Sequence, residues 1–212
     1  MKIQVFVCNP FQENTYVVYD DSGEALIIDP GFYDEGEFLP AKKFIDGNGL
    51  KLRRLLNTHL HLDHSMGNHF IGESFGIQAS ANKADVFLQK KVNGQAEMFG
   101  LPWRGSIPAI TDFLKEGDLV NVGQMNFRVL EVPGHTPGGL AFYEEFEGTV
   151  FVGDSLFCGG IGRTDLPGGN ENTLLNAIRS KLLTLPPQTL ALSGHGPSTT
   201  IAAEIPDLES YR

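Results

Sequence analysis

The stretch Thr58-His59-Leu60-His61-Leu62-Asp63-His64 decides how this sequence is interpreted. It places three imidazoles and one carboxylate within six residues, directly after a predicted strand at 52–56. Burying so many polar groups together is costly unless they share a partner. Imidazole and carboxylate are good ligands for Zn, Fe and Mn, and no cysteine lies in the segment to compete. The segment therefore predicts a metal site.

The spacing within this segment indicates two metal ions. His59 and His61 are two residues apart, so their side chains point to the same side of an extended backbone. We expect Asp63 to continue that side, whereas His64 points elsewhere unless the chain turns there. One short segment would thus supply two adjacent metals.

Three further candidate ligands follow predicted strands elsewhere in the chain, each next to a glycine: His135, Asp154 and His195. Functional sites in open α/β folds form beyond the ends of strands. We expect His135 to complete the first metal site and His195 the second. Asp154 is the natural bridge because a carboxylate has two oxygens. Two metals about 3.5–4 Å apart can share a hydroxide as nucleophile.

Composition limits the class of protein. The 212 residues are enough for one large α/β domain, and the formal net charge of -10 argues against nucleic-acid binding. No apolar run approaches the ~20 residues that span a bilayer. Cys8 and Cys158 are expected to be free thiols, and the N-terminus does not resemble a signal peptide. A cytoplasmic location is therefore the default expectation, and the oligomeric state stays open.

Strand and helix patterns alternate along the chain. The first 30 residues predict a β-meander, and the rest of the first half predicts helices at about 34–48, 67–75 and 82–91 with short strands at 52–56 and 77–79. The second half predicts hairpins at 119–132 and 140–152, an amphipathic helix at 172–185 and a last strand at 189–192. His69, on the predicted helix 67–75, is expected to be structural. Two sheets covered by outer helices satisfy this order.

The motif at 58–64 resembles the signature of the metallo-β-lactamase superfamily. The resemblance spans nearly the whole chain and includes Leu26–Gly31, the Gly-His-Thr loop at His135, Gly153-Asp154 and Gly194-His195-Gly196. It implies an α/β (α+β) fold: a four-layer αβ/βα sandwich of two mixed β-sheets flanked by helices, in a single domain over residues 1–212.

The resemblance also implies roles for individual residues. It assigns His59, His61 and His135 to one metal, and Asp63, His64 and His195 to the other, with Asp154 bridging. It makes Asp63 and Asp154 the catalytic carboxylates, and Asp29 a group that orients ligands through hydrogen bonds. The implied cofactors are two divalent metal ions, zinc first, with iron or manganese as alternatives.

The segment 157–165, Phe-Cys-Gly-Gly-Ile-Gly-Arg-Thr-Asp, resembles the glyoxalase II group, especially its short bacterial type. The presence of both His64 and Asp154 fits thioester hydrolases better than true β-lactamases. The implied reaction is hydrolysis of a thioester such as S-lactoylglutathione. The chain ends about 17 residues after His195, so we expect it to lack the C-terminal helical region that grips glutathione in the long enzymes.

The substrate-binding residues are the least defined part of the prediction. Arg163 is a candidate for holding a substrate carboxylate, with pairing to Asp165 as an equal alternative. Tyr143 and the segment 99–103 are candidates for lining the pocket, with packing in the core as the commoner role of an aromatic residue. The expected partner is a small-molecule thioester or ester, with no nucleic acid and no membrane.

Other functions stay open at this stage. One is a mononuclear iron persulfide dioxygenase of the same fold, relying on His59, His135 and Asp154. Another is a lactone or ester hydrolase. A non-catalytic binding protein is the remaining class, but such a protein is expected to have lost ligands, and all seven are present here.

Overall fold

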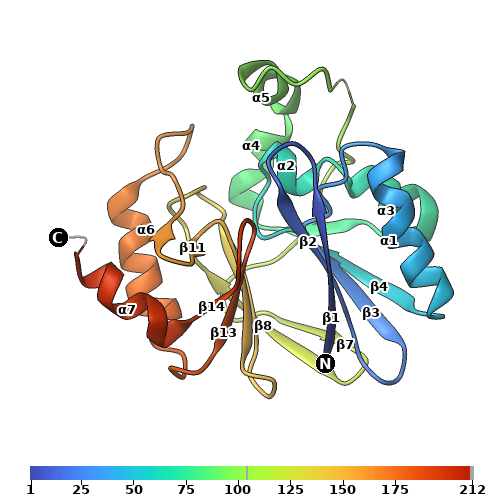
Figure 1. The fold of residues 1–212 in the computed structure, drawn as a ribbon. Coiled ribbons are helices and arrows are strands. Elements are labelled where there is room, and N and C mark those ends of the chain that lie inside the picture. The colour runs from blue at the N-terminus through green and yellow to red at the C-terminus, as the bar shows by residue number, and fades with distance from the viewer. Residues whose placement is uncertain (104, 211–212) are drawn as a thin grey trace.

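The computed structural model describes residues 1–103 and 105–210, which form two six-stranded sheets (Figure 1). The first sheet contains, in spatial order, β1 (Lys2–Cys8), β2 (Glu13–Tyr19), β3 (Glu24–Ile28), β4 (Lys51–Leu56), β5 (Ala79–Ala81) and β6 (Asp112–Phe113). The second contains β14 (Thr199–Thr200), β13 (Leu190–Ser193), β10 (Thr149–Gly153), β9 (Leu140–Glu144), β8 (Met125–Glu131) and β7 (Leu119–Val122). A small ribbon pairs β11 (Leu156–Phe157) with β12 (Gly160–Ile161).

Both large sheets mix parallel and antiparallel pairs. Strands β1 to β3 form the predicted antiparallel meander, while β3, β4, β5 and β6 run parallel to one another. In the second sheet β10 and β13 are parallel and the other pairs are antiparallel. The expected pair of mixed sheets is confirmed.

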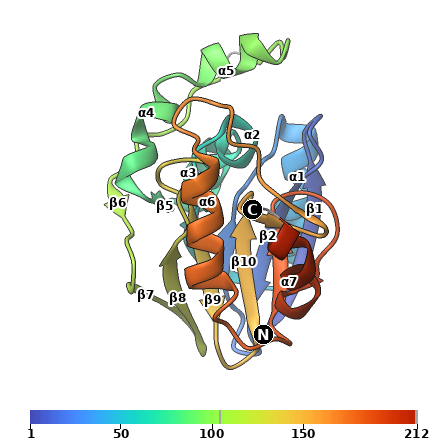
Figure 2. The same cartoon turned by 90° about the vertical axis from the view of Figure 1, so that its left-hand side faces the viewer.

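Helices cover the outer face of each sheet. The helical elements are α1 (Glu35–Gly47), α2 (Leu62–Ser65), α3 (Asn68–Phe75), the 3₁₀ turn η1 (Lys83–Asp85), α4 (Val86–Gln89), α5 (Val92–Met98), α6 (Glu171–Ala177), the π-helical turn η2 (Ile178–Leu182) and α7 (Ile201–Ser210). α1 and α3 lie on the outer side of the first sheet, and α6 and α7 cover the second (Figures 1 and 2). The four layers are therefore helix, sheet, sheet, helix, as expected.

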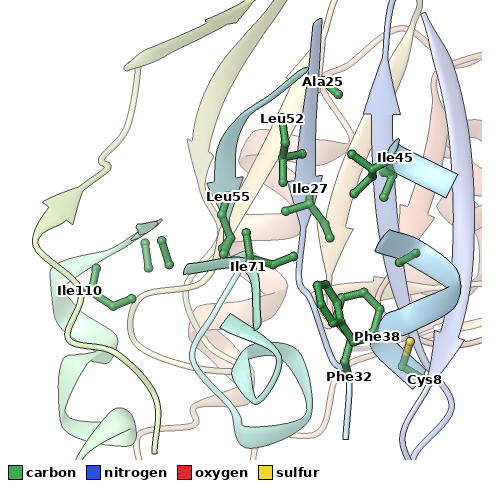
Figure 3. Close-up of a cluster of buried hydrophobic side chains, with 14 of the residues drawn as sticks. Cys8, Ala25, Ile27, Phe32, Phe38, Ile45, Leu52, Leu55, Ile71 and Ile110 are labelled. Carbon is green, nitrogen blue, oxygen red and sulfur yellow. The ribbon is translucent and has the colours of Figure 1, made fainter. Parts of the chain in front are cut away.

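Three apolar cores hold the layers together, and strand alternation divides residues between them. On β3, Ala25 and Ile27 face the core under α1, which Figure 3 shows together with Phe38 of that helix. The intervening Leu26 and Ile28 face the core between the two sheets. A third core lies between the second sheet and α6–α7. Because β3 is buried on both faces, it consists almost entirely of apolar residues.

Several predicted elements differ in detail from the structure. The strand expected at 77–79 lies at Ala79–Ala81. Asn82 caps the short η1 turn, accepting a hydrogen bond from Ala84 N at 2.9 Å, and the predicted helix 82–91 is divided between η1 and α4, which ends at Gln89. The helix expected at 172–185 begins at Glu171 and becomes π-helical at Ile178. β14 and α7 follow the strand that was expected to be last.

The loops after four strands meet at one edge of the sandwich. β4 belongs to the first sheet, and β8, β10 and β13 belong to the second. Backbone hydrogen bonds join two of these loops to strands of the opposite sheet, from Leu140 N of β9 to Thr58 O (2.7 Å) and from Asn14 N of β2 to Gly194 O (2.7 Å). Every candidate ligand lies on one of these loops or directly after it.

Two other features of the described chain bear on the sequence predictions. Cys8 is buried and Cys158 exposed, and both are free thiols as expected. None of the helices in residues 1–103 and 105–210 is both long and apolar enough to cross a membrane.

Candidate metal centre

The segment 59–64 changes from extended to helical within its own length. His61 is the last extended residue (φ -65°, ψ 155°), and helix α2 begins at Leu62. Asp63 and His64 therefore lie on the first turn of a helix, and the expectation that Asp63 continues an extended strand is corrected. Ser65 Oγ donates to His61 O (2.8 Å) and Asn57 Nδ2 donates to His64 O (2.8 Å), which fixes this turn.

The structure brings all seven predicted ligands together as two groups with a carboxylate between them. In each group one donor atom per residue lies within 4.8 Å of the others: His59, His61 and His135 in the first, and Asp63, His64 and His195 in the second. Asp154 Oδ2 lies 3.7 Å from His135 Nε2 and 3.5 Å from His195 Nε2. This carboxylate oxygen is thus placed between the two groups.

Backbone carbonyls set the orientation of two of the imidazoles. His135 Nδ1 lies 2.7 Å from Arg163 O, and His195 Nδ1 lies 3.0 Å from Phe11 O. A carbonyl oxygen only accepts hydrogen bonds, so each Nδ1 carries the hydrogen and donates it. The lone pair of each Nε2 is left directed at the site, which is the arrangement found for metal-binding histidines.

Asp29 orients two further imidazoles. Its Oδ1 accepts a hydrogen bond from Thr58 N (2.7 Å), and its Oδ2 accepts one from Thr58 Oγ1 (2.5 Å) and lies 3.1 Å from His64 Nδ1. Thr58 Oγ1 in turn lies 3.1 Å from His59 Nδ1. Asp29 is also close enough to His59 and His64 to form a third group of ligand atoms, but both of its oxygens already accept hydrogen bonds. These contacts fit the predicted role of orienting ligands.

The residues present fit divalent metal ions. Three buried side-chain atoms that face the site have no hydrogen-bond partner among the described residues: His59 Nε2, His64 Nε2 and Asp154 Oδ1. An unsatisfied buried polar atom costs about 1–3 kcal/mol, so three together indicate a missing partner. His195 Nε2 lies 3.3 Å from Asp63 Oδ2, and His64 Nε2 lies 3.4 Å from Asp154 Oδ1. Donors bound tetrahedrally at about 2.0–2.1 Å are separated by about this distance.

Burial and charge set the protonation of these groups. Burial, reinforced by the other imidazoles, lowers the pKa of His59 well below its ordinary value and that of His61 to about 3. Burial also opposes the charged form of His64, but the carboxylates of Asp154 and Asp63 outweigh it and raise the pKa of His64. Burial acts to raise the pKa of Asp154, yet the charge of His64 keeps it low. A metal bound by His64 would therefore displace a proton.

A cavity of about 220 Å³ opens over these groups. It is lined by predicted metal ligands and by the predicted substrate-binding residue Arg163. His61, Asp63 and Asp154 form part of its wall, and Arg163 stands at its side. Two hydrogen bonds of 2.7 Å pair the Arg163 guanidinium with Asp165. The alternative in which Arg163 pairs with Asp165 is thus confirmed, and the exposed Arg163 side chain also lines the cavity. The holding of a substrate carboxylate by Arg163 stays a prediction.

The structure corrects the placement of Tyr143. Its side chain is 2% exposed and packs in the core between the second sheet and α6–α7. The described residues that line the cavity do not include it. Alternation along β9 explains the error, because Tyr143 faces outward while Phe142 faces the core between the sheets. Of the segment 99–103, Phe99 lines the cavity, and Trp103 is buried in a neighbouring apolar cluster.

Two buried acidic residues near the site were not found from the sequence. Asp85 accepts hydrogen bonds from Leu60 N (3.3 Å), Thr136 Oγ1 (2.8 Å) and Gly138 N (2.6 Å), which ties the first ligand loop to the loop of His135. Glu13 is fully buried, and its Oε1 lies 3.9 Å from His64 Nδ1. No pattern in the sequence marks either residue, because each reaches its partners only through the tertiary fold.

One glycine beside a predicted ligand is required by close packing. A Cβ added to Gly194 would lie 2.5 Å from His64 Cε1 and would also overlap Asp154 Oδ1. These approaches are shorter than any Cβ contact in a relaxed structure. Gly194 thus lets two candidate ligands approach the strand end, which is the role expected for glycine there.

Comparison with known proteins identifies the family of the chain. The family model described as the metallo-beta-lactamase superfamily matches residues 8–195. The chain is 40% identical over 205 residues to hydroxyacylglutathione hydrolase GloC of Haemophilus influenzae, covering 96% of this chain and 95% of that protein.

Two solved structures are similar over nearly the whole chain. The crystal structure of the BLEG-1 B3 metallo-beta-lactamase has a TM-score of 0.85 at 34% identity, with 97% of each chain covered. The structure of TTHA1623 in a di-iron-bound form has a TM-score of 0.81 at 37% identity, covering 92% of this chain and 93% of that one. With the fold, the two groups of His and Asp ligands and the family match in agreement, the chain belongs to the metallo-β-lactamase superfamily of metal-dependent hydrolases.

Proposed function

We propose that this protein hydrolyses a thioester of the hydroxyacylglutathione type, using two divalent metal ions. The observation that carries the proposal is the position of Asp154 Oδ2 between the two ligand groups, 3.7 Å from His135 Nε2 and 3.5 Å from His195 Nε2. A carboxylate in this position can serve two ions at once. The likeness to a named hydroxyacylglutathione hydrolase at 40% identity supports the choice of substrate.

Each candidate residue would have a separate role in metal binding, water activation or substrate binding. His59, His61 and His135 would hold one ion and Asp63, His64 and His195 the other, with Asp154 shared. The bound ions would supply a hydroxide nucleophile at neutral pH and polarise the substrate carbonyl. Asp63, whose side chain is 19% exposed, would also accept a hydrogen bond from the attacking water. Arg163 would hold a substrate carboxylate at the cavity wall.

The leaving group fits the residues of the cavity. A thiol has a pKa of about 8.5, so the thiolate departs with little need for a proton donor. The cavity wall offers ionised carboxylates and imidazoles directed at the site, and the pKa of Asp154 is too low for it to donate a proton. An alkoxide or amine leaving group is much more basic than a thiolate and therefore depends more on protonation.

The test combines metal analysis with two assays on the purified protein. We expect two divalent ions per chain by elemental analysis, release of thiol from S-lactoylglutathione, and loss of both after chelation with recovery when metal is returned. Because TTHA1623 is described in a di-iron-bound form, iron is assayed beside zinc and manganese. A lactone panel run in parallel tests the ester alternative. Oxygen consumption with glutathione persulfide, one iron per chain and no thiol release would overturn the proposal in favour of the mononuclear dioxygenase.

A further inference from the structure

A second cavity, of about 290 Å³, adjoins the one over the ligands. Its walls are mainly apolar and come from two separate parts of the chain: Leu88, Met98 and Phe99 from the region of α4 and α5, and Leu166 and Pro167 from the loop after Arg163. The region of α4 and α5 stands above the sandwich in both views (Figures 1 and 2).

The two cavities are continuous. His61, Gln95, Phe99 and Leu166 line both of them. A molecule that reaches the donor atoms of His61 is therefore already at the wall of the second cavity. Phe99 contacts Phe11 edge to face, with ring centroids 5.2 Å apart, so an aromatic pair stands where the two spaces meet.

The polar groups at this boundary are satisfied within the protein. Gln95 Oε1 accepts a hydrogen bond from Leu62 N (3.0 Å), and its Nε2 donates to Leu88 O (3.0 Å). The charged side chain in the lining, Lys91, has its Nζ 5.6 Å from the centroid of the Phe87 ring, a cation–π contact. Apart from the exposed Lys91 ammonium and the His61 imidazole, the lining thus presents little that a polar ligand could use.

The helix that carries the apolar wall is fixed on its other side. Val92 and Ala96, one turn apart on α5, are buried in a cluster with Leu62 of the ligand segment. Met98 is nevertheless 62% exposed and Phe99 40% exposed. Large apolar side chains that are held in place yet left open next to a reactive site indicate a surface that another apolar group covers.

We propose that the second cavity binds an apolar arm of the thioester substrate, on the order of ten carbon atoms long. This inference rests on the proposed function and names the substrate class more closely. A core cavity of about 150 Å³ accommodates benzene, so about 290 Å³ accommodates a group roughly twice that size. The three-carbon lactoyl group would leave it largely unfilled. The preferred substrate is therefore a more apolar thioester than S-lactoylglutathione.

Two series of thioesters test the proposal with the metal-loaded protein. One varies the acyl chain from acetyl to octanoyl on a fixed thiol, N-acetylcysteamine, and the other varies an alkyl thiol on a fixed acetyl group. We expect kcat/KM to rise in one of the series by roughly fourfold for each CH₂ buried. The series that rises identifies which arm enters the cavity, and a flat response in both overturns the proposal.

A glycine on α5 offers a variant that fills the cavity. Gly94 lines it, and a Cβ added there meets nothing within 4 Å. We expect Gly94→Leu to lower the ratio of kcat/KM for the longest and shortest members of the rising series at least tenfold. Gly47→Leu, also at an open helical glycine but at the end of α1, should leave that ratio unchanged. An unchanged ratio in Gly94→Leu would assign the chain-length effect elsewhere and overturn the proposal.

Binding can also be measured without turnover. With ¹³C-methyl methionine, we expect octanoate to shift the Met98 resonance and acetate to leave it unmoved, while Met125, in the core between the sheets, reports no change with either. If octanoate does not shift the Met98 resonance, the proposal is overturned. If Met98 responds but no thioester is hydrolysed, the proposed function fails and the apolar cavity stands as a binding site.

Discussion

Asp29 Oδ2 lies 3.1 Å from Nδ1 of His64, and both side chains are buried. Asp29→Asn replaces one of the two acceptor oxygens with an amide that donates, so the carboxylamide can no longer satisfy Thr58 and His64 together. Loss of such an orienting contact lowers metal affinity by about 10–100-fold. We expect this loss in a competition titration against a chromophoric chelator. Asp34→Asn makes the same chemical change at the N-cap of α1 and should leave affinity unaltered; equal affinities in the two variants would contradict the role of Asp29.

Substitution of single histidines should separate the two ligand groups. We expect His61→Ala and His195→Ala each to lower the metal content from two ions toward one per chain, with loss of activity, while circular dichroism shows a folded protein. His69→Ala is the matched control, because His69 lies on α3 with its Nδ1 2.9 Å from Met66 O and belongs to neither group. Retention of two ions in both site variants would refute the assignment.

Asp85 gives a prediction for the dependence of stability on pH. Burial is the main reason that its pKa lies above the ordinary value of 3.8, although Thr136 and Gly138 donate hydrogen bonds that oppose the shift. From pH 3.8 up to the raised pKa the folded protein holds this proton more firmly than the unfolded chain. The contribution of Asp85 to the free energy of unfolding therefore falls as pH rises through that window.

Asp85→Asn removes this titration, and its amide nitrogen cannot accept the hydrogen bonds that either oxygen of a carboxyl group can accept. We expect the variant to be less stable by about 1–3 kcal/mol near pH 4, with the difference from the parent narrowing toward neutral pH. Urea denaturation of the chelator-treated protein at each pH measures the free energy of unfolding of parent and variant. Thr136→Val deletes one hydrogen bond but keeps the carboxyl group of Asp85. The difference in free energy of unfolding between this variant and the parent should therefore not narrow as pH rises. A constant difference for Asp85→Asn would count against a raised pKa.

Arg163 and Asp165 should act in opposite directions on substrate binding. The Arg163–Asp165 pair is exposed, so breaking it should change the melting temperature little. We expect Arg163→Ala to raise KM for a thioester that carries a carboxylate by several fold. Asp165→Asn frees the guanidinium and should lower that KM. Matched thioesters lacking the carboxylate should show neither effect, and equal changes with both kinds of substrate would exclude recognition of a carboxylate by Arg163.

Gly194 tests how closely the site is packed. An added methyl group overlaps Asp154 Oδ1 and approaches His64 Cε1, so Gly194→Ala should displace two candidate ligands. We expect metal content to fall below one ion per chain, and activity to be lost. Gly47→Ala adds the same methyl group where a Cβ has open space, and should leave metal content unchanged. A fully loaded and active Gly194→Ala protein would show that the strand end can relax.

The ligands could be predicted from sequence because they depend on local and repeated features. His59, His61 and His64 are close in the chain, and His135 and His195 each follow a strand beside a glycine. Strand and helix periodicity similarly predicted the meander and α1. The start of α2 at Leu62 was not predicted, because the side-chain hydrogen bonds that fix the turn, from Ser65 to His61 O and from Asn57 to His64 O, leave no periodic pattern in the sequence.

The substrate side of the site was harder to predict. Tyr143 was a candidate for lining the pocket, but strand alternation places its side chain on the opposite face of the sheet. The apolar cavity could not be foreseen, since Leu88, Met98 and Leu166 meet only when α4, α5 and the loop after Arg163 fold over the same edge. Periodicity describes one element at a time, whereas a pocket depends on the relation between several.

The division of the ligands between the two sheets has a mechanical consequence. Four come from the loop after β4 of the first sheet, and three follow strands of the second: His59, His61, Asp63 and His64, and His135, Asp154 and His195. Each ion would be bound by ligands from both sheets and would therefore cross-link the two halves of the sandwich. At a free ion concentration 100 times Kd, one such ion adds ~2.7 kcal/mol to the resistance of the fold against unfolding. Loss of the metal ions would then weaken the contact between the two halves of the sandwich and also abolish the activity.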